Sequence, residues 1–266
     1  MIPEILPISK GKLSSAVGLK RKKTREEKGL FLAEGHKCVE DLFSSFACIS
    51  LLVRKDSCMR YMGLIEEASA KGSGIFSLSA QEMAKVSSFA TPSDIIGVFC
   101  KPEPSSLPDK MHEYELLLDS IQDPGNLGTI IRAADWFGFR RIFASFETAD
   151  VFNAKTIQAT MGALGRVEVH YCDLRQLVSA HPEMAVYGLV LDGGDIYSSS
   201  LSASGFIVMG NEGNGIGTPL LEKITSPLRI PSYPAGVPTS ESLNVAMATA
   251  ITLAEFRRRQ IMTKDG

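Results

Sequence analysis

The chain has 266 residues, of which 44% are hydrophobic and 22% are charged, and its formal net charge at pH 7 is −2. This composition is typical of a globular protein with one or two domains, and the near-neutral charge excludes a polycation. No apolar run approaches the roughly 20 residues that span a bilayer, so a membrane-spanning protein is also excluded.

The start of the chain and its cysteines both indicate a cytoplasmic location. Residues Met1–Lys12 lack the apolar stretch that follows basic residues in a secretory signal. The cysteines form no C-x-x-C pair and have no flanking histidine pattern, so we expect buried thiols and neither a disulfide framework nor a metal site. They are Cys38, Cys48, Cys58, Cys100 and Cys172.

Local charge is far from neutral near the start of the chain. Between Lys10 and Lys28 there are eight basic and two acidic residues, a net charge of +6. Such a block suits phosphate binding, because neutralised phosphates release their condensed counterions. The residues that we expect to contact phosphate are Lys20, Arg21, Lys22, Lys23 and Arg25. A solvated, charge-rich helix is the alternative, and composition alone does not separate the two.

The first hundred residues predict a small α/β domain. Apolar residues recur at helical spacing in Val39–Phe46, and an apolar run with strand-like composition occupies Ile96–Cys100. A segment rich in proline, serine and charge follows, which is typical of a linker. We therefore expect a first domain at 1–100, a linker at 101–113 and a second domain at 114–262.

The second domain alternates strand and helix signals. Glu115–Ser120 has the apolar centre expected of a strand that is buried on both faces, and a DPGN turn and a helix closed by Gly138 follow it. Further strands are predicted at Arg141–Ala144, Val167–Tyr171, Val186–Leu191, Phe206–Met209 and Leu228–Ile230. Further helices are predicted at Val151–Leu164 and Leu174–His181. The chain is predicted to end in a long helix, on one face of which lie Leu243, Met247, Ala250 or Ile251, and Ala254. This alternation predicts a parallel sheet covered on both faces.

Three segments at predicted strand ends carry the most informative residues, because open α/β sheets bind ligands there. The first runs from Asp123 to Phe139. Gly128 and Arg132 are four residues apart and share a helix face. The glycine would let a ligand approach the arginine, whose planar donor fork suits a phosphate. A surface pair between Arg132 and Asp135 is the alternative.

The second segment, FIVMGNEGNGIG, places four glycines directly after an apolar strand. The spacing matches neither G-x-G-x-x-G nor a P-loop. Glycines leave backbone groups bare, so such a turn can wrap around a ligand, with Asn211 and Glu212 at its mouth. The glycines are Gly210, Gly213, Gly215 and Gly217. We predict a ligand-binding loop here.

The third segment, Arg229–Ala250, leads from a strand end through a Pro/Gly loop into a helix. Ser240 is a suitable N-cap for that helix. Ser242 and Asn244 would then lie in its first turn, close to backbone N–H groups that have no partner within the helix. A capped helix behind a rigid loop, without a ligand, is the alternative interpretation.

Together the three segments resemble the signature motifs of the SpoU family of SPOUT RNA methyltransferases. Asn126, Gly128 and Arg132 match N-x-G-x-x-x-R; Gly210, Glu212, Gly213 and Gly215 match G-x-E-G-x-G; Ile230–Pro231 and Ser242–Val245 match I-P … S-L-N-V. Motif order and approximate spacing agree over residues 114–260, although the loop within the third motif is longer than usual. The first domain more loosely resembles the L30e-like substrate-binding domain that often precedes this catalytic domain.

The resemblance implies a fold and an activity that hydrophobic periodicity does not show. It implies a C-terminal α/β domain with a parallel sheet and a trefoil knot, preceded by a smaller α/β RNA-binding domain. It also implies transfer of a methyl group from S-adenosylmethionine to a ribose 2′-hydroxyl of structured RNA, either tRNA or rRNA, without a metal. The family works as a homodimer, in which Arg132 would face the cofactor of the other subunit.

The resemblance also assigns roles to single residues. Arg132 would fix an RNA phosphate and stabilise the developing alkoxide, because a guanidinium stays protonated and is therefore a poor base. Asn126 and Glu212 would orient the ribose or Arg132. The residues expected to hold the cofactor are Gly210, Asn211, Gly213, Ile230, Ser242, Leu243 and Asn244.

Two other classes of function remain as alternatives. A non-catalytic RNA-binding protein could keep this fold, and cofactor-dependent product formation separates it from the enzyme. A nucleotide-dependent enzyme of the Rossmann type is disfavoured by the glycine spacing and by the absence of an early acidic ribose partner.

Overall fold

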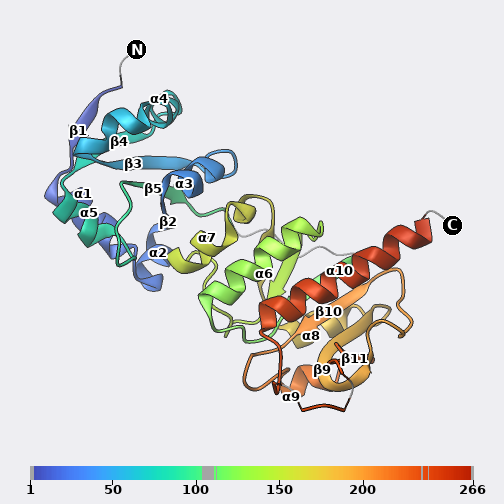
Figure 1. Cartoon of the computed structure of the whole chain (residues 1–266). Coiled ribbons are helices and arrows are strands. Elements are labelled where there is room, and N and C mark those ends of the chain that lie inside the picture. The colour runs from blue at the N-terminus through green and yellow to red at the C-terminus, as the bar shows by residue number, and fades with distance from the viewer. Residues whose placement is uncertain (1–2, 104–110, 112, 235, 239, 265–266) are drawn as a thin grey trace. The chain divides into compact units, whose positions relative to one another are not determined.

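The computed structural model describes residues 3–103, 111, 113–234, 236–238 and 240–264. Two compact units make up the chain (Figure 1): the N-terminal unit comprises Met1–Glu103 and Asp150–Arg166, and the C-terminal unit comprises Pro104–Ala149 and Val167–Gly266. Most of the linker expected at 101–113 lies outside the described residues. No helix in the described ranges is long and apolar enough to cross a membrane.

A five-stranded sheet forms the centre of the N-terminal unit. The strands of this sheet are β1 (Ile5–Pro7), β2 (Leu30–Glu34), β3 (Cys48–Arg54), β4 (Gly74–Leu78) and β5 (Ile95–Cys100). The helices of the unit are α1 (Lys10–Gly18), α2 (Lys22–Lys28), α3 (His36–Leu42), α4 (Met62–Ala70) and α5 (Ala80–Val86), and a 3-10 turn, η1, spans Lys55–Tyr61. The strand order is β1-β4-β3-β5-β2, and β5 runs antiparallel to both of its neighbours. The small α/β domain expected ahead of the second domain is confirmed.

The basic block forms α1 and α2, and one of its cations is buried. Arg25 is only 4% exposed. Its Nη1 donates to the backbone carbonyls of Leu19 and Lys20, both at 2.9 Å, and its Nε donates to the Asp150 carboxylate at 3.1 Å. The expectation that Arg25 contacts phosphate is therefore wrong, because all of these donors are used to hold the unit together. Sequence spacing cannot separate this buried cation from the exposed lysines around it.

The N-terminal unit also includes Asp150–Arg166, a segment from much later in the chain. It contains the helix α7 (Ala154–Thr160) and a 3-10 turn, η2 (Ala163–Gly165). The predicted helix Val151–Leu164 is too long: Asn153 caps the start of α7, and Met161 ends it in the left-handed conformation at φ 49°.

Close packing holds this segment against the rest of the N-terminal unit. The rings of Phe152 and Phe31 have centroids 4.8 Å apart. At Gly162, an added Cβ would lie 2.6 Å from the Asp41 carboxylate, so only glycine fits. The segment falls inside the second domain expected at 114–262, but it packs with the N-terminal unit.

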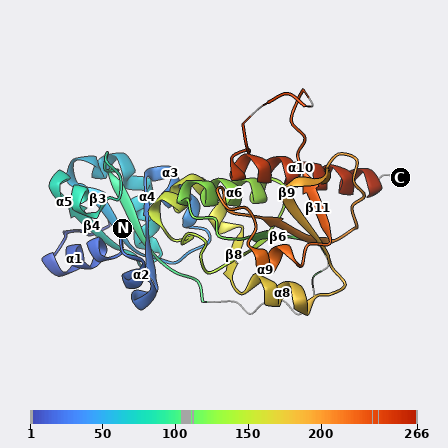
Figure 2. The same ribbon diagram turned by 90° about the horizontal axis from the view of Figure 1, so that it is seen from below.

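The C-terminal unit is a six-stranded parallel sheet with helices on both faces. Its strands are β6 (Tyr114–Leu118), β7 (Arg141–Ala144), β8 (Glu168–Tyr171), β9 (Ala185–Asp195), β10 (Gly205–Met209) and β11 (Ser226–Arg229), and its helices are α6 (Pro124–Trp136), α8 (Leu174–Ala180), α9 (Thr218–Leu221) and α10 (Val245–Lys264). The strand order is β11-β9-β10-β6-β7-β8. Figure 2 shows α6 and α10 on one side of the sheet and α8 and α9 on the other. The predicted α/β class and parallel sheet are confirmed.

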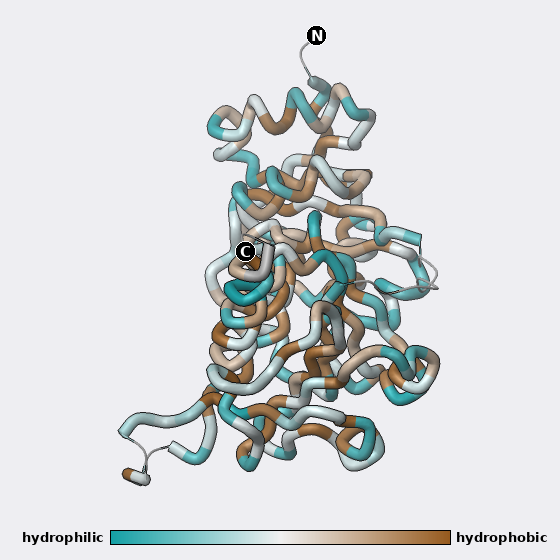
Figure 3. The backbone as a smooth tube through the Cα atoms, turned by 90° about the vertical axis from the view of Figure 1, so that its right-hand side faces the viewer, coloured by the Kyte–Doolittle hydropathy of each residue, from teal (hydrophilic) through white to brown (hydrophobic). Residues whose placement is uncertain are grey.

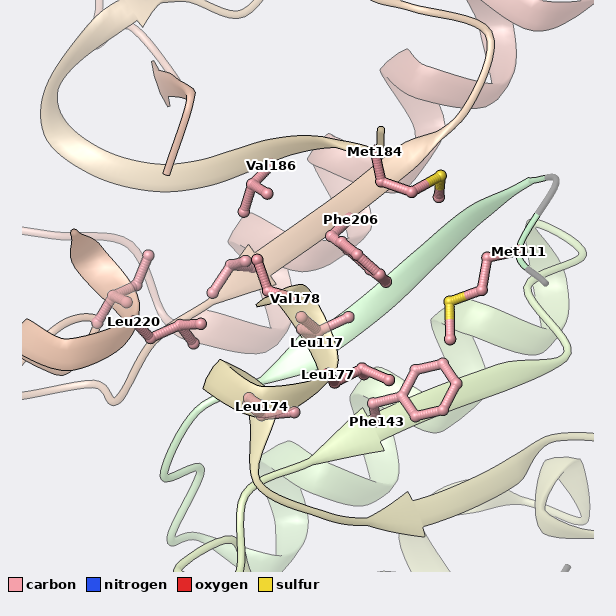
Figure 4. Packing of buried hydrophobic residues seen from close by; sticks show 12 residues of the cluster. Met111, Leu117, Phe143, Leu174, Leu177, Val178, Met184, Val186, Phe206 and Leu220 are labelled. Carbon is pink, nitrogen blue, oxygen red and sulfur yellow. The ribbon is translucent and has the colours of Figure 1, made fainter. Parts of the chain in front are cut away.

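Apolar side chains from the central strands and from α8 form the hydrophobic core on one face of the sheet (Figure 4). Leu117, Phe143 and Phe206 come from three neighbouring strands and are fully buried, and Leu177 of α8 packs on them. Every residue of β6 is buried, as expected for a strand that has helices on both sides. This packing fixes where the carboxyl ends of the strands lie.

The last helix, α10, buries a different face from the one predicted. Its buried residues are Val245, Ala246, Thr249, Thr252, Leu253, Glu255 and Phe256. Two residues of the predicted face, Leu243 and Met247, are 46% and 61% exposed. Leu243 precedes the helix, and hydrophobic spacing alone could not show that threonine and glutamate side chains would occupy the inner face.

We expect the buried pair of Arg25 and Asp150 to matter more for stability than surface pairs do. Replacing Arg25 with methionine leaves the Asp150 carboxylate without its partner, which should lower the free energy of unfolding by about 3–5 kcal/mol. The control is Lys22→Met, since Lys22 and Glu26 lie 3.9 Å apart with both side chains more than half exposed, and its loss should stay below about 0.5 kcal/mol. Urea unfolding measures both, and equal losses would contradict this prediction.

Glu255 should make the stability of the C-terminal unit depend on acid pH. Hydrogen bonds from Arg258 and Arg259 lower the pKa of its carboxyl to about 2. Because this folded-state pKa lies below the unfolded value, the contribution is complete above about pH 5 and disappears as the pH falls toward 2. The unfolding free energy of the parent should exceed that of Glu255→Gln by ~2 kcal/mol at pH 7 and by much less near pH 3. A difference that does not change with pH would refute the assignment.

Candidate active site

The first two glycine-containing segments follow neighbouring strands of the parallel sheet. β6 and β10 pair directly, with Leu118 opposite Met209, and the backbone N–H of Asp119 continues the pairing by donating to the Met209 carbonyl at 2.9 Å. The first segment leaves the end of β6, and the second leaves the end of β10. Parallel pairing therefore brings them to the same edge of the sheet, as the sequence predicted.

The DPGN sequence is the first turn of α6 and does not precede it. Asp123 is the N-cap, and its carboxylate accepts a hydrogen bond from the Asn126 backbone N–H at 2.8 Å. Pro124 occupies the first helical position, where it has no N–H to leave unpaired. This cap fixes the backbone of Asn126 and leaves its side chain free to bond elsewhere.

The Asn126 side chain joins all three segments. Its Nδ2 donates to Oε1 of Glu212 at 2.7 Å, and its Oδ1 accepts from Nδ2 of Asn244 at 3.0 Å. Asn244 in turn accepts, through Oδ1, from the backbone N–H groups of Ala246 and Met247. Asn126, Glu212 and Asn244 were each proposed from sequence, and the structure brings them together in one hydrogen-bonded row.

Asn244, and not Ser240, therefore caps the last helix. Ser240 lies four residues before Asn244, outside α10, and Ser242 and Leu243 are exposed residues of the preceding loop. The described parts of this loop stand away from the body of the C-terminal unit in Figures 2 and 3. Ile230, half-buried, begins the loop directly after β11.

The glycine loop after β10 folds back on itself. Asn211 and Gly215 exchange two backbone hydrogen bonds of 2.9 Å, and the Asn211 side chain accepts from the backbone N–H groups of Gly213 and Asn214. Gly215 has a φ of 69°, and a Cβ on Gly210 would lie 2.3 Å from the Gly215 carbonyl carbon. Two of the glycines are therefore required for the loop to close.

Two residues that the sequence did not single out anchor this loop to β6. The Asp119 carboxylate accepts from the backbone N–H of Gly217 at 2.7 Å, and the Ser120 carbonyl accepts from Nδ2 of Asn211 at 2.8 Å. Ser120 adopts a left-handed φ of 58°, which is unusual for a residue with a side chain. The only sequence signal for this anchoring role was that Asp119 and Ser120 directly follow the apolar residues of a buried strand.

Arg132 lies on the exposed side of α6, six residues after Asn126. Among the residues that the structure describes, its guanidinium has no ion-pair or hydrogen-bond partner. Asp135, its alternative partner from sequence, binds Arg140 instead at 2.8 Å. Gly128, one turn earlier, is buried. Within the described part of the chain no anion pairs with Arg132, so its guanidinium can bind an anionic group of a ligand.

The residues at this edge of the sheet offer chemical groups that suit S-adenosylmethionine. Nothing lies within 4 Å of the position that a Cβ would take on Gly215, so bare backbone faces open space there. Leu243 leaves apolar surface uncovered, 46% exposed. Backbone groups beside apolar side chains suit an adenosine, which combines a flat ring with polar edges.

Comparisons with known proteins agree with this geometry. Residues 113–254 match the model of the SpoU rRNA Methylase family, and residues 11–97 match the MRM3-like substrate binding domain. The chain is 33% identical over 244 residues to the 23S rRNA (guanosine(2553)-2′-O)-methyltransferase RlmP of Bacillus subtilis, covering 90% of this chain and 93% of the relative.

Two solved structures have the same fold along nearly their whole length. A putative RNA methyltransferase of the TrmH family from Porphyromonas gingivalis is 32% identical, with a TM-score of 0.81 over 95% of this chain and 99% of the other. An rRNA methyltransferase from Sinorhizobium meliloti, solved with bound AdoMet, is 26% identical, with a TM-score of 0.81 over 96% and 98%. The chain belongs to the SpoU rRNA methylase family, as its three motifs predicted.

Proposed function

We propose that this protein transfers a methyl group from S-adenosylmethionine to a ribose 2′-hydroxyl of ribosomal RNA. The observation that carries the proposal is the row of Asn126, Glu212 and Asn244, which joins the three motifs. The helix that carries Asn126 also carries Arg132, an exposed cation with no partner among the described residues. The relatives named as rRNA 2′-O-methyltransferases, and the neighbour solved with AdoMet, support it. They favour rRNA over tRNA and favour the enzyme over a non-catalytic RNA-binding protein.

Arg132 acts on the RNA in this proposal. S-adenosylmethionine, when bound, supplies the electrophilic methyl group. The Arg132 guanidinium binds the phosphate next to the target ribose and stabilises the negative charge that develops on the 2′-oxygen. It does not remove the proton, because a guanidinium stays protonated in proteins, so the RNA phosphate or water accepts that proton.

Asn126 and Glu212 position the reacting groups. The Glu212 carboxylate uses Oε1 to accept from Asn126, which leaves Oε2 available to orient the ribose or Arg132. Asn126 is held on both sides, by Glu212 and Asn244, so its amide cannot rotate without breaking a hydrogen bond. This rigidity favours in-line approach of the hydroxyl, on which methyl transfer depends.

The cofactor would be held chiefly by backbone groups. The side chains of Asn211 and Asn244 already make hydrogen bonds within the loops, so their part is to shape the site. We propose that the backbones of Gly210, Ile230 and Leu243 hold the adenosine, with Gly213 and Ser242 beside its polar groups.

Three further elements of the sequence interpretation complete the proposal. The exposed cations Lys20, Arg21, Lys22 and Lys23 contact RNA phosphates. The protein works as a homodimer in the cytoplasm, with Arg132 of one subunit beside the cofactor of the other. The knot of the C-terminal domain remains a prediction from the family resemblance.

Removing Arg132 should slow methyl transfer strongly without abolishing cofactor binding. Arg132→Ala should lower kcat by about 100- to 1,000-fold, the usual effect of removing one group that stabilises a developing oxyanion. Arg132→Lys should recover only a small part, because an ammonium cannot form the two-pronged contact with phosphate. Methyl-labelled S-adenosylmethionine and rRNA from a strain lacking the gene provide the assay, with label in an alkali-resistant dinucleotide as the product. Near-normal turnover of Arg132→Lys would refute the two-pronged contact.

Asn126 should be sensitive to replacement by an equally sized carboxylate. Asn126→Asp removes the donor to Glu212 and places two carboxylates at 2.7 Å, the present donor–acceptor distance, so kcat should fall by about 100-fold. Glu212→Gln is the matched control, since its side-chain carbonyl can still accept from Asn126, and it should retain more activity than Asn126→Asp. The reverse order would show that the Glu212 charge, and not the shared hydrogen bond, is what the reaction requires.

A further inference from the structure

The N-terminal unit contains a cleft, and Lys20 is the one lining residue that already has a role in the proposed function. Its volume is about 310 Å³, and its walls come from the turn after α1, from β2 and from the start of the Asp150–Arg166 segment. The volume is at the lower end of the range for small-molecule sites, which suits a ligand of the size of one nucleotide. Parts of the chain that are far apart in sequence build the cleft, with Ser88 completing its lining.

The inner wall of the cleft is apolar and carries an aromatic ring. Leu19 and Leu32 are 2% and 3% exposed. Phe152 is half-buried, fixed by the Phe31 ring at 4.8 Å, and the ammonium group of Lys101 lies 5.0 Å from the Phe152 ring centroid. A flat heterocycle placed here would lose little water and would meet a ring that is already held in place.

The outer wall of the cleft is cationic. Lys20 and Lys155 are exposed and line it, and no carboxylate is among its lining residues. Lys20 donates one hydrogen bond, to the Lys85 carbonyl at 3.0 Å, and an ammonium group has three donors. The third cation of the lining, Arg25, is paired with Asp150 and therefore adds no free charge. Two ammonium groups beside an apolar wall suit a phosphate attached to a base.

We propose that this cleft binds one nucleotide of the substrate RNA, with the base against Phe152 and a phosphate between Lys20 and Lys155. The inference rests on the proposed function, because it assumes an RNA substrate. Arg21, Lys22 and Lys23 directly follow Lys20 and are exposed, so positive charge continues along the chain beyond the cleft. A polynucleotide can use this continuation, since each further phosphate releases counterions, whereas a free mononucleotide cannot.

The test measures binding of an in vitro transcript of 23S rRNA to the full-length chain by filter binding at several salt concentrations. The double variant Lys20→Ala/Lys155→Ala should raise Kd about tenfold at 0.15 M salt and lower the salt slope by about 1–2. Phe152→Leu should raise Kd about tenfold with the salt slope unchanged, because it removes stacking and no charge. Lys55→Ala, an exposed cation of the same unit outside the cleft lining, is the control for losing a lysine elsewhere on the unit and should leave Kd within about twofold.

Methyl transfer and cofactor affinity separate this inference from the proposed function. In the cleft variants, KM for the transcript should rise in parallel with Kd and by a larger factor than any fall in kcat, and the Kd for S-adenosylmethionine should match that of the parent. If the parent binds the transcript but transfers no methyl group, the proposed function fails, and the Kd values still test the cleft. Cleft variants that bind the transcript as Lys55→Ala does would overturn the inference. A second result would also overturn the inference: the parent binds AMP, the cleft variants do not, and their affinity for the transcript is unchanged. The occupant of the cleft would then be a free nucleotide.

Discussion

One asparagine side chain holds the candidate active site together. Asn126 donates to Glu212 and accepts from Asn244, so a single amide connects the start of α6, the glycine loop after β10 and the start of α10. An amide is suited to this position because it has a donor and an acceptor on one planar group. A carboxylate would lose the bond to Glu212, and a hydroxyl could not reach both partners with fixed geometry.

The parallel sheet makes this connection possible. β6 and β10 are adjacent, and so the loops after them leave the same edge. The left-handed Ser120 and the close approach of Gly210 to Gly215 then turn the two loops toward each other, with Asp119 and Asn211 as anchors. Arg132, on the exposed side of the same helix that carries Asn126, is the charged group left for a ligand. Its position is therefore set by α6, whose first turn is held at this edge by the hydrogen bonds of Asn126.

The N-terminal unit depends on a segment that the sequence assigns elsewhere. Asp150 neutralises the buried Arg25, and Phe152 packs on Phe31. Residues 150–166 lie within the part of the chain that matches the SpoU methylase family, yet they complete the core and the cleft of the unit that contains the match to a substrate binding domain. An N-terminal domain cut at residue 100 would therefore leave apolar surface and the Arg25 guanidinium uncovered.

The sequence by itself determined the α/β class, the parallel sheet and the residues of the three motifs, because strand and helix periodicity and glycine spacing are local properties. It also singled out Asn126, Glu212 and Asn244 as site residues, without showing that they bond to one another. Tertiary structure alone decided that Arg25 is buried while Lys22 is exposed, that residues 150–166 pack with the N-terminal unit, and that α10 turns Thr249 and Phe256 inward in place of Leu243 and Met247. Each of these depends on a partner distant in sequence. The same side-chain spacing is compatible with burial or exposure until that partner is in place, so no local pattern could have supplied the answer.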